Sequence, residues 1–355
     1  MTVQESFRLT SLAHGGGCGC KIAPGLLSQI LRDQASAIVP PELLVGLASS
    51  DDAAVYQLNP QQALIATTDF FTPIVDNPHD FGRIAASNAL SDIYAMGGQP
   101  IFALAITGMP IDKLAPEVIR EILAGGQQVC QQAGIPIAGG HSIDTAEPIY
   151  GLVVLGLAHP EQIKRNSSAE AGDVLVLSKP LGIGLYSAAL KRGLLSDADY
   201  QTLLGYTTQL NRPGTALAQL SEVHALTDVT GFGLLGHLLE IARGSGLSAS
   251  IQYSRLPLLS RATEFATQGV ITGASRRNWQ SYGEAIDLAE ALTESQRAIL
   301  CDPQTSGGLL ISCAPACLNQ VSELLQQQGF SEAAVIGTMR KPDLNTTNSR
   351  IKVSE

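Results

Sequence analysis

Short apolar runs and longer amphipathic segments alternate along most of the 355-residue chain, with glycine- and proline-rich connections between them. The run "QALIATTDFF" (62–71) predicts a buried strand ending at Asp69, and "FGRIAASNALSDIYAMGG" (81–98) predicts a helix closed by glycines. The next predicted elements are strand 101–109, helix 116–133, strand 135–140 and strand 149–158. This order is typical of an α/β fold.

The helix predicted within 81–98 has an apolar stripe and a separate polar face. Phe81, Ala85 and Ile93 belong to the stripe. Asn88 and Asp92 are four residues apart and therefore share another face. We expect Asp92 to point away from the core.

The second half repeats the alternation of strands and helices, beginning with "DVLVLS" (173–178). The segment "KRNSSAEAGD" (164–173) is polar and lacks strong periodicity, so it is the candidate linker. The sequence thus predicts a lead-in over 1–48 and two α/β domains over 49–163 and 164–355. The tail "KPDLNTTNSRIKVSE" (341–355) is expected to be peripheral.

Composition narrows the functional classes. The net charge is −10, with 22 basic and 32 acidic residues, which disfavours a nucleic-acid or anionic membrane surface. No apolar run approaches the roughly 18 residues of a membrane span, and the first ten residues do not resemble a signal peptide. We expect a cytoplasmic protein whose six cysteines are thiols.

Acidic residues cluster at the ends of the predicted elements, namely Asp51, Asp52, Asp69, Asp92 and Asp228. Any one of them alone is most simply a helix cap or a turn residue. As a convergent set they would repel one another unless a cation that prefers oxygen ligands, such as Mg²⁺, lay between them. Such ions commonly bridge carboxylates to the phosphates of a nucleotide.

Glycine-rich segments are compatible with phosphate binding through backbone N–H groups. They are "GGGCGCK" (15–21), "AGGHS" (138–142), "TGFGLLG" (230–236) and "TSGG" (305–308). No P-loop motif occurs, and "GFGLLG" is read more simply as a tight turn into a helix than as a dinucleotide site. His141 is either a partly buried residue bonded to its own loop or a ligand contact.

The six cysteines fall into two groups. Cys130, Cys301, Cys313 and Cys317 are expected to be buried as small hydrophobic residues. Cys18 and Cys20 have glycine neighbours that cannot bury them, and Lys21 would favour a thiolate. We therefore expect a reactive thiol beside a phosphate-seeking lysine on a mobile segment.

Six blocks of this sequence resemble selenophosphate synthetase, also called selenide, water dikinase. They are "HGGGCGCK", "SSDDAAVY", "TTDFFTPIVDNPHDFGRIAASNALSDIYAMGG", "AGGHSID", "LTDVTGFGLLGH" and "CDPQTSGGLL", within a resemblance that runs from Leu9 to Thr338. The resemblance implies the two-domain α/β (α+β) fold of the aminoimidazole ribonucleotide synthetase superfamily, with mixed sheets and an ATP site between domains and subunits. It also implies a homodimer that converts ATP and selenide, free or protein-delivered, to selenophosphate, AMP and orthophosphate.

The resemblance also implies residue roles. Cys18 matches a catalytic position that is often selenocysteine in the family, and Lys21 matches the essential lysine. The implied Mg²⁺ ligands are Asp52, Asp92 and Asp228. The implied ATP contacts are Lys21, Ser49, Ser50, Asp51, Asp69, Asp92, Gly140, His141 and Ser142.

Two alternatives stay open from the sequence. Purine-pathway ligases and thiamine monophosphate kinase of the same superfamily would share the aspartates but would not need "CGCK". A non-catalytic selenium or metal carrier would use Cys18 and Cys20 on a relic nucleotide-binding fold.

Overall fold

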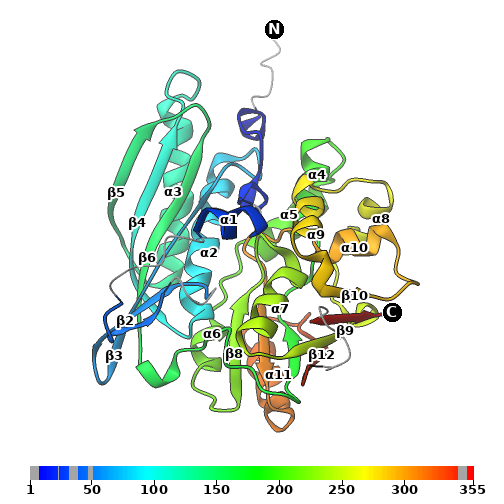
Figure 1. Cartoon of the computed structure of the whole chain (residues 1–355). Coiled ribbons are helices and arrows are strands. Elements are labelled where there is room, and N and C mark those ends of the chain that lie inside the picture. Colours follow the sequence, from blue (N-terminus) through cyan, green and yellow to red (C-terminus); the bar gives the residue numbers. More distant parts are fainter. Residues whose placement is uncertain (1–7, 23, 32–38, 47–50, 343–349) are drawn as a thin grey trace.

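The protein contains two mixed β-sheets, each with helices packed against it (Figure 1). The computed structural model describes residues 8–22, 24–31, 39–46, 51–342 and 350–355. Ser49 and Ser50, two of the expected ATP contacts, lie outside the described residues. Among the described elements, no helix is long and apolar enough to cross a membrane.

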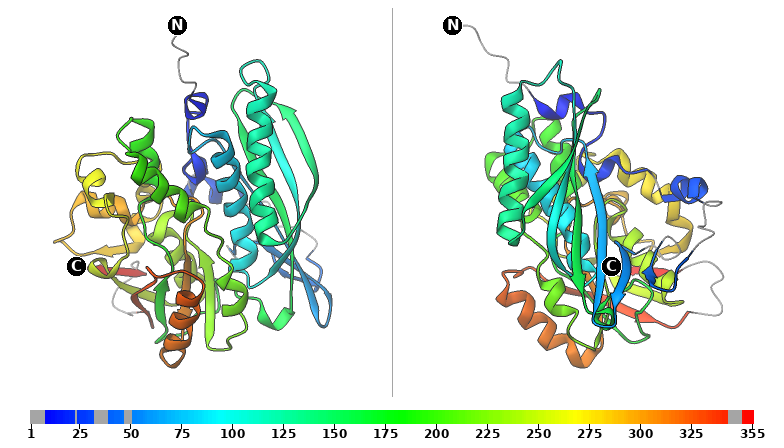
Figure 2. Two further views of the ribbon diagram at one scale, coloured as in Figure 1. Left: turned by 180° about the vertical axis from the view of Figure 1, so that it is seen from behind. Right: turned by 90° about the vertical axis from the view of Figure 1, so that its left-hand side faces the viewer.

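The first sheet has the strand order β1-β2-β3-β6-β4-β5. Its strands are β1 (Leu43–Val45), β2 (Ala54–Asn59), β3 (Gln62–Phe71), β4 (Gln99–Met109), β5 (Ile137–Asp144) and β6 (Ile149–Ala158). Helices α2 (Pro78–Ala95) and α3 (Pro116–Ala133) pack against each other and against this sheet. Seen from behind, α3 lies in front of the sheet (Figure 2, left).

The second sheet has the order β10-β13-β9-β12-β7-β11-β8. Its strands are β7 (Val174–Leu177), β8 (Val223–Asp228), β9 (Ser248–Gln252), β10 (Ile286–Leu288), β11 (Leu309–Cys313), β12 (Ala334–Arg340) and β13 (Ile351–Ser354). The helices of this half are α4 (Ile183–Lys191), α5 (Asp197–Thr207), α6 (Pro213–Leu217), α7 (Gly233–Gly244), α8 (Ala262–Thr267), α9 (Gly273–Tyr282), α10 (Glu294–Leu300) and α11 (Leu318–Gln327). Helix α1 (Pro24–Leu31) packs on α9.

The predicted elements of the first half are present with shifted ends, since α2 covers Pro78–Ala95 rather than 81–98 and β3 ends at Phe71 rather than Asp69. The strand expected over 135–140 is β5, which begins at Ile137 and continues to Asp144. Its polar continuation pairs with β4 through backbone hydrogen bonds, which do not require apolar side chains.

Helix α2 is the central element, because it packs against β3 and β6 and also against β8, α5 and α6 of the second half. Asn77 caps its N-terminus by accepting the Asp80 N–H at 3.0 Å. The predicted apolar stripe is buried, yet Asn88 on the polar face is also 0% exposed. At Asn88 the polar face of α2 is therefore covered by protein, whereas Asp92 on the same face is partly exposed.

The described end of the tail, residues 350–355, is not peripheral, contrary to the sequence expectation. Strand β13 lies inside the second sheet and pairs in parallel with both β9 and β10. Ile351 and Val353 are completely buried, whereas Lys352 between them is exposed. Its alternation of apolar and polar residues is the two-residue period of a strand with one buried face, and four residues are too short to reveal it.

Candidate active site

Three carboxylates meet where the two halves of the molecule join. Asp52 lies just before β2, Asp92 lies on α2, and Asp228 ends β8. One oxygen of each lies within 4.8 Å of the others. The expected metal-binding aspartates are thus brought together, from segments 40 and 136 residues apart.

Hydroxyl groups orient two of these carboxylates. Thr67 on β3 donates to Asp92, and Thr227 on β8 donates to Asp52 at 2.7 Å. The Oδ2 atoms of Asp52 and Asp228 are buried without a hydrogen-bond partner among the described residues. Acceptor atoms left in this state are available to a cation.

The carboxylates perturb one another. Burial and the neighbouring charges of Asp228 and Asp92 raise the pKa of Asp52 well above its ordinary value. Burial, then Asp228 and Asp69, raise the pKa of Asp92 in the same way. Burial also raises the pKa of Asp228. Keeping three ionised carboxylates this close together in a buried site costs free energy because they repel one another. A divalent cation bound between them lowers that cost.

The spacing of β3 against α2 explains how the site is built. Thr67 and Asp69 are two positions apart on β3, and side chains with this period point to the same face. Two strand residues span about 6.6 Å and four helix residues about 6 Å, so the pair on β3 matches Asn88 and Asp92 on α2. Asn88 donates to Asp69 at 2.6 Å while Thr67 donates to Asp92.

Lys21 reaches this group from the N-terminal segment. Its ammonium lies 3.4 Å from the Oδ2 of Asp69, and its side chain is 38% exposed. Desolvation lowers the pKa of Lys21, but attraction to Asp69 and to further acidic groups outweighs it and raises the pKa overall. Lys21 is therefore a charged group at the edge of the carboxylate cluster.

Cys18 lies in the 3₁₀ helix η2 (Gly17–Cys20) and is 1% exposed. Its thiol donates to Asn88 Oδ1 at 3.1 Å, and its N–H donates to Thr305 Oγ1 at 3.0 Å. The expectation that glycine neighbours leave Cys18 unburied is wrong, because the covering groups come from α2 and from residues 305–308. Cys20 is only partly buried.

Lys21 favours a thiolate at Cys18, as expected, but stronger effects act in the opposite direction. Burial raises the pKa of Cys18 well above its ordinary value, and the charge of Asp69 raises it further. Lys21 lowers the pKa of Cys18, but by less than these two effects. Burial and the charge of Asp69 therefore favour the protonated thiol over the thiolate.

The glycines of this segment allow close packing. Gly17 has φ of +54°, a left-handed conformation that favours glycine. A Cβ atom at Gly17 would lie 2.4 Å from Thr305 Oγ1. The Gly17 N–H donates to the Thr72 carbonyl at 2.9 Å. Thr305 and Thr72, the residue that follows β3, thus both hold the segment.

The remaining expected ATP contacts are not all near the carboxylates. Asp51 accepts the Asn166 N–H at 2.7 Å and so ties the start of the first half to the linker. Gly140, His141 and Ser142 lie on the exposed edge strand β5. Register pairs connect Gly140 to Asp69 through β4 and β6, which is three strand spacings or about 14 Å.

The structure also tests the predictions for His141, for "GFGLLG" and for four of the cysteines. His141 is exposed, so the interpretation of His141 as a partly buried residue is wrong. "GFGLLG" forms a turn at Gly233, with φ of +71°, that leads directly into α7. The four cysteines expected to be buried are buried.

The sequence did not identify Asn88, Thr305 or Ser306 as site residues. The shared face of Asn88 and Asp92 and the segment "TSGG" were the available signals. Their meaning depends on pairings such as Ser306 N–H to Asn88 Oδ1 at 2.7 Å, which joins residues 218 positions apart.

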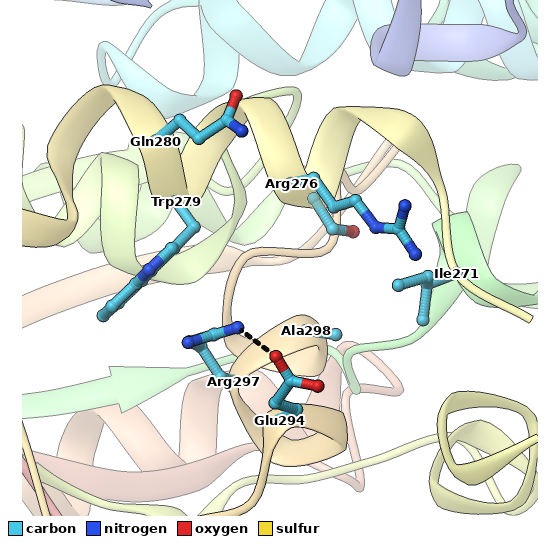
Figure 3. Close-up of a pocket in the computed structure, with 8 residues that line it drawn as sticks. Ile271, Arg276, Trp279, Gln280, Glu294, Arg297 and Ala298 are labelled. Atoms are coloured by element: carbon cyan, nitrogen blue, oxygen red, sulfur yellow. Dashed lines mark hydrogen bonds and ion pairs between the residues drawn. The ribbon is translucent and has the colours of Figure 1, made fainter. Parts of the chain in front are cut away.

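A separate cavity of about 310 Å³ lies between α9 and α10 (Figure 3). Arg297 pairs with Glu294 at 2.9 Å there, and its guanidinium lies 5.0 Å from the Trp279 ring centre. None of the expected site residues lines this cavity.

Comparisons with known proteins identify the family. Residues 50–158 match the family "AIR synthase related protein, N-terminal domain", and residues 170–346 match the corresponding C-terminal domain. The chain is 62% identical over 336 residues to selenide, water dikinase of Pseudomonas straminea, covering 94% of this chain and 93% of the relative. The chain belongs to the selenide, water dikinase family. It is an enzyme with the two-domain AIR synthase-related fold.

Other members of the selenide, water dikinase family match equally fully. The relative from Dechloromonas aromatica is 60% identical, with 95% of this chain and 97% of the relative covered. The relative from Rhizobium meliloti is 56% identical, with 93% and 95% covered. The resemblance inferred from the sequence blocks is confirmed.

Solved structures confirm the fold alone, because their identities are low. Thiamine-monophosphate kinase from Stenotrophomonas maltophilia has a TM-score of 0.64 at 20% identity, covering 94% of this chain and 96% of that chain. Hydrogenase maturation protein HypE in complex with ATP has a TM-score of 0.58 at 18% identity, covering 98% and 95%.

Proposed function

We propose that the site transfers the γ-phosphoryl group of ATP to selenide, giving selenophosphate, AMP and orthophosphate. The observation that carries the proposal is the convergence of Asp52, Asp92 and Asp228 beside the Lys21–Asp69 pair and the Cys18 thiol. In the first step the bond from the γ-phosphorus to the bridging oxygen breaks, a phosphorus–selenium bond forms and ADP leaves. Hydrolysis of ADP then consumes one water and releases AMP and orthophosphate.

The three aspartates fit Mg²⁺ as ligands, since they supply buried, partly unpartnered carboxylate oxygens within reach of one another. When bound, Mg²⁺ would offset the charge of the triphosphate. Thr67 and Thr227 keep two of the carboxylates oriented, so the site does not depend on flexible side chains.

Lys21 supplies a positive charge for the transferring phosphoryl group. Its partly exposed ammonium is held beside the carboxylate cluster by the ion pair with Asp69. Positioned charge of this kind stabilises the transition state of phosphoryl transfer.

In this proposal Cys18 binds hydrogen selenide without forming a sulfur–selenium bond, so no oxidant is needed, and the selenide itself attacks the γ-phosphorus. The sulfur is buried and bonded to Asn88 in the described arrangement, so the N-terminal segment must open to admit selenium and close again over ATP. Enclosure would also keep ADP in place for the second, hydrolytic step.

Replacing Cys18 tests this role. Cys18→Ser replaces the thiol by a hydroxyl and so removes the polarisable sulfur, and selenophosphate formation should collapse while ATP binding survives. Cys20→Ser should retain much more activity. The measurement is selenide-dependent AMP production by each variant, with nucleotide affinity by calorimetry. Near-normal activity of Cys18→Ser would exclude the thiol from the reaction.

We further propose that the active enzyme is a homodimer whose ATP site uses both subunits. Tyr56, Phe70 and Ile143 are 40%, 46% and 52% exposed. Register places them on the face of the first sheet opposite the buried side chains of β3. An exposed apolar face of this kind is typical of an interface. It would bring Gly140–Ser142 of the partner toward the carboxylates.

Mixing two inactive variants tests this arrangement. One variant carries Asp228→Asn and the other carries His141→Ala with Ser142→Ala. If one site combines both subunits, re-associated heterodimers regain one intact site, and activity should return to about a quarter of wild type. No recovery, with heterodimers present, would place both elements in the same subunit's site.

For the domains, we propose the boundaries predicted from the sequence, with a lead-in over 1–48 and domains over 49–163 and 164–355. We also propose a cytoplasmic location. Phosphorus NMR of the protein with ATP, Mg²⁺ and selenide under anaerobic conditions tests the proposed reaction, because selenophosphate, AMP and orthophosphate should form together.

A further inference from the structure

Asn88 lies between the Cys18 thiol, the Asp69 carboxylate and the second half of the molecule. Its side chain is 0% exposed. Oδ1 accepts from the Cys18 thiol and from the Ser306 N–H, and Nδ2 donates to Asp69. Asp69 in turn pairs with Lys21. One carboxamide therefore connects the two residues proposed for catalysis.

The orientation of this carboxamide is fixed by its partners. The Ser306 N–H can only donate, so it requires the oxygen of Asn88, and an ionised Asp69 can only accept, so it requires the nitrogen. What faces the Cys18 sulfur is therefore an acceptor. An acceptor stabilises a thiol that carries its proton and repels an ionised sulfur.

Residues 305–308 are themselves held firmly. Lys179 donates to the Ser306 carbonyl at 3.0 Å, and Asn211 donates to the Gly307 carbonyl at 2.8 Å. Both donors are 1% exposed. Ser306 has φ of +51°, a conformation that non-glycine residues keep only when their surroundings enforce it. The acceptor offered to Cys18 thus has a fixed place.

We propose that Asn88 is a positioning residue that latches the N-terminal segment closed by accepting a hydrogen bond from the Cys18 thiol. It fixes Cys18 and, through Asp69, Lys21 in one arrangement. This inference rests on the proposed roles of Cys18 and Lys21.

The rate at which iodoacetamide modifies each cysteine tests the latch. In wild type, Cys18 should react slowly because it is buried. Asn88→Ala should speed modification of Cys18 by about tenfold, on the scale of losing one hydrogen bond. The buried Cys130, Cys301 and Cys313 should keep their rates, because a local latch does not loosen the rest of the core.

Ser87→Ala is the matched control. Ser87 is the preceding residue of α2, is 1% exposed, and its hydroxyl has no hydrogen-bond partner among the described residues. Its loss should leave the Cys18 rate unchanged. An unchanged Cys18 rate in folded Asn88→Ala, or equal acceleration at every buried cysteine, would overturn the proposal.

A second measurement leaves Asn88 and Asp69 intact. Cys18→Ser keeps an O–H donor toward Asn88, whereas Cys18→Ala removes it. The readout is hydrogen exchange at the backbone amides of positions 17 and 18, which donate to Thr72 and Thr305. The exchange rate should rise about tenfold in Cys18→Ala and stay low in Cys18→Ser. Equal exchange in the two variants would contradict the latch. Neither measurement uses ATP or selenide, so failure of the proposed reaction would be seen separately.

Discussion

Asp302 shows how burial changes a single residue next to the site. Burial raises its pKa to about 7, although Leu185 and Gln304 donate hydrogen bonds to it. The ordinary value is 3.8, so between these two pH values the folded protein binds more protons than the unfolded chain. The stabilisation by protonated Asp302 is complete below the unfolded pKa and is lost as pH rises through the folded pKa.

Asp302→Asn removes this titration. We expect the stability of wild type relative to Asp302→Asn to fall as pH rises toward about 7 and then level off. The total change is up to about 4 kcal/mol, at about 1.4 kcal/mol per pKa unit. Urea unfolding of both proteins at several pH values checks it. A constant difference would show that Asp302 titrates normally.

The metal site gives a second prediction at this scale. Replacing Asp52, Asp92 or Asp228 by Ala should lower Mg²⁺-dependent ATP turnover at least about 100-fold, because each removes a key electrostatic group. Asp51→Ala is the neighbouring comparison and should affect metal binding less, since Asp51 lies outside the cluster. Turnover and Mg²⁺ titration of each variant provide the check. Near-normal turnover in all three would refute the assignment.

At the residue scale, the sequence predicted which aspartates lie together, but it did not predict that Cys18 is buried. The aspartates stand at element ends, where sites are commonly built, and the family blocks include them. Cys18 has only glycines and a lysine nearby in sequence, and these indicate an exposed thiolate. Its burial comes from Asn88 and Thr305, which are 70 and 287 positions away, and no local pattern reports contacts at that range.

At the scale of elements, β13 gives a stability prediction. Ile351 is completely buried between neighbouring strands, so Ile351→Ala should cost about 2–5 kcal/mol through lost burial and a cavity. Lys352→Ala, on the exposed face of the same strand, should change stability by less than about 0.5 kcal/mol. Denaturant unfolding measures both. Equal small effects would mean that β13 contributes little to the sheet.

Elements were predicted well where their period was long and clear. Helix α3 and strand β6 have the bounds that the sequence pattern indicated, because each is periodic over ten or more residues. Strand β13 and the continuation of β5 were missed for the opposite reason. Their residues are strands because of the neighbours they pair with, and pairing is not visible in a short polar segment.

At the scale of the whole molecule, the carboxylate cluster joins the two halves. Asp52 and Asp92 come from the first half and Asp228 from the second, so a ligand bound there should stabilise both. Mg²⁺ with ATP at a hundred times its dissociation constant should add about 2.7 kcal/mol to the free energy of unfolding. Asp228→Asn should lose most of this gain. Thermal unfolding with and without Mg²⁺–ATP checks it, and an equal gain in the variant would place the ligand elsewhere.

The position of β13 also has a consequence for synthesis. The chain makes β9 and β10 long before β13, yet β13 must lie between them. Until it arrives, the second sheet ends at β9, whose unpaired backbone groups could pair with another nascent chain. A chaperone that shields an open strand edge during translation would therefore matter more for the second half of this enzyme than for the first, whose six strands are all complete by Ala158.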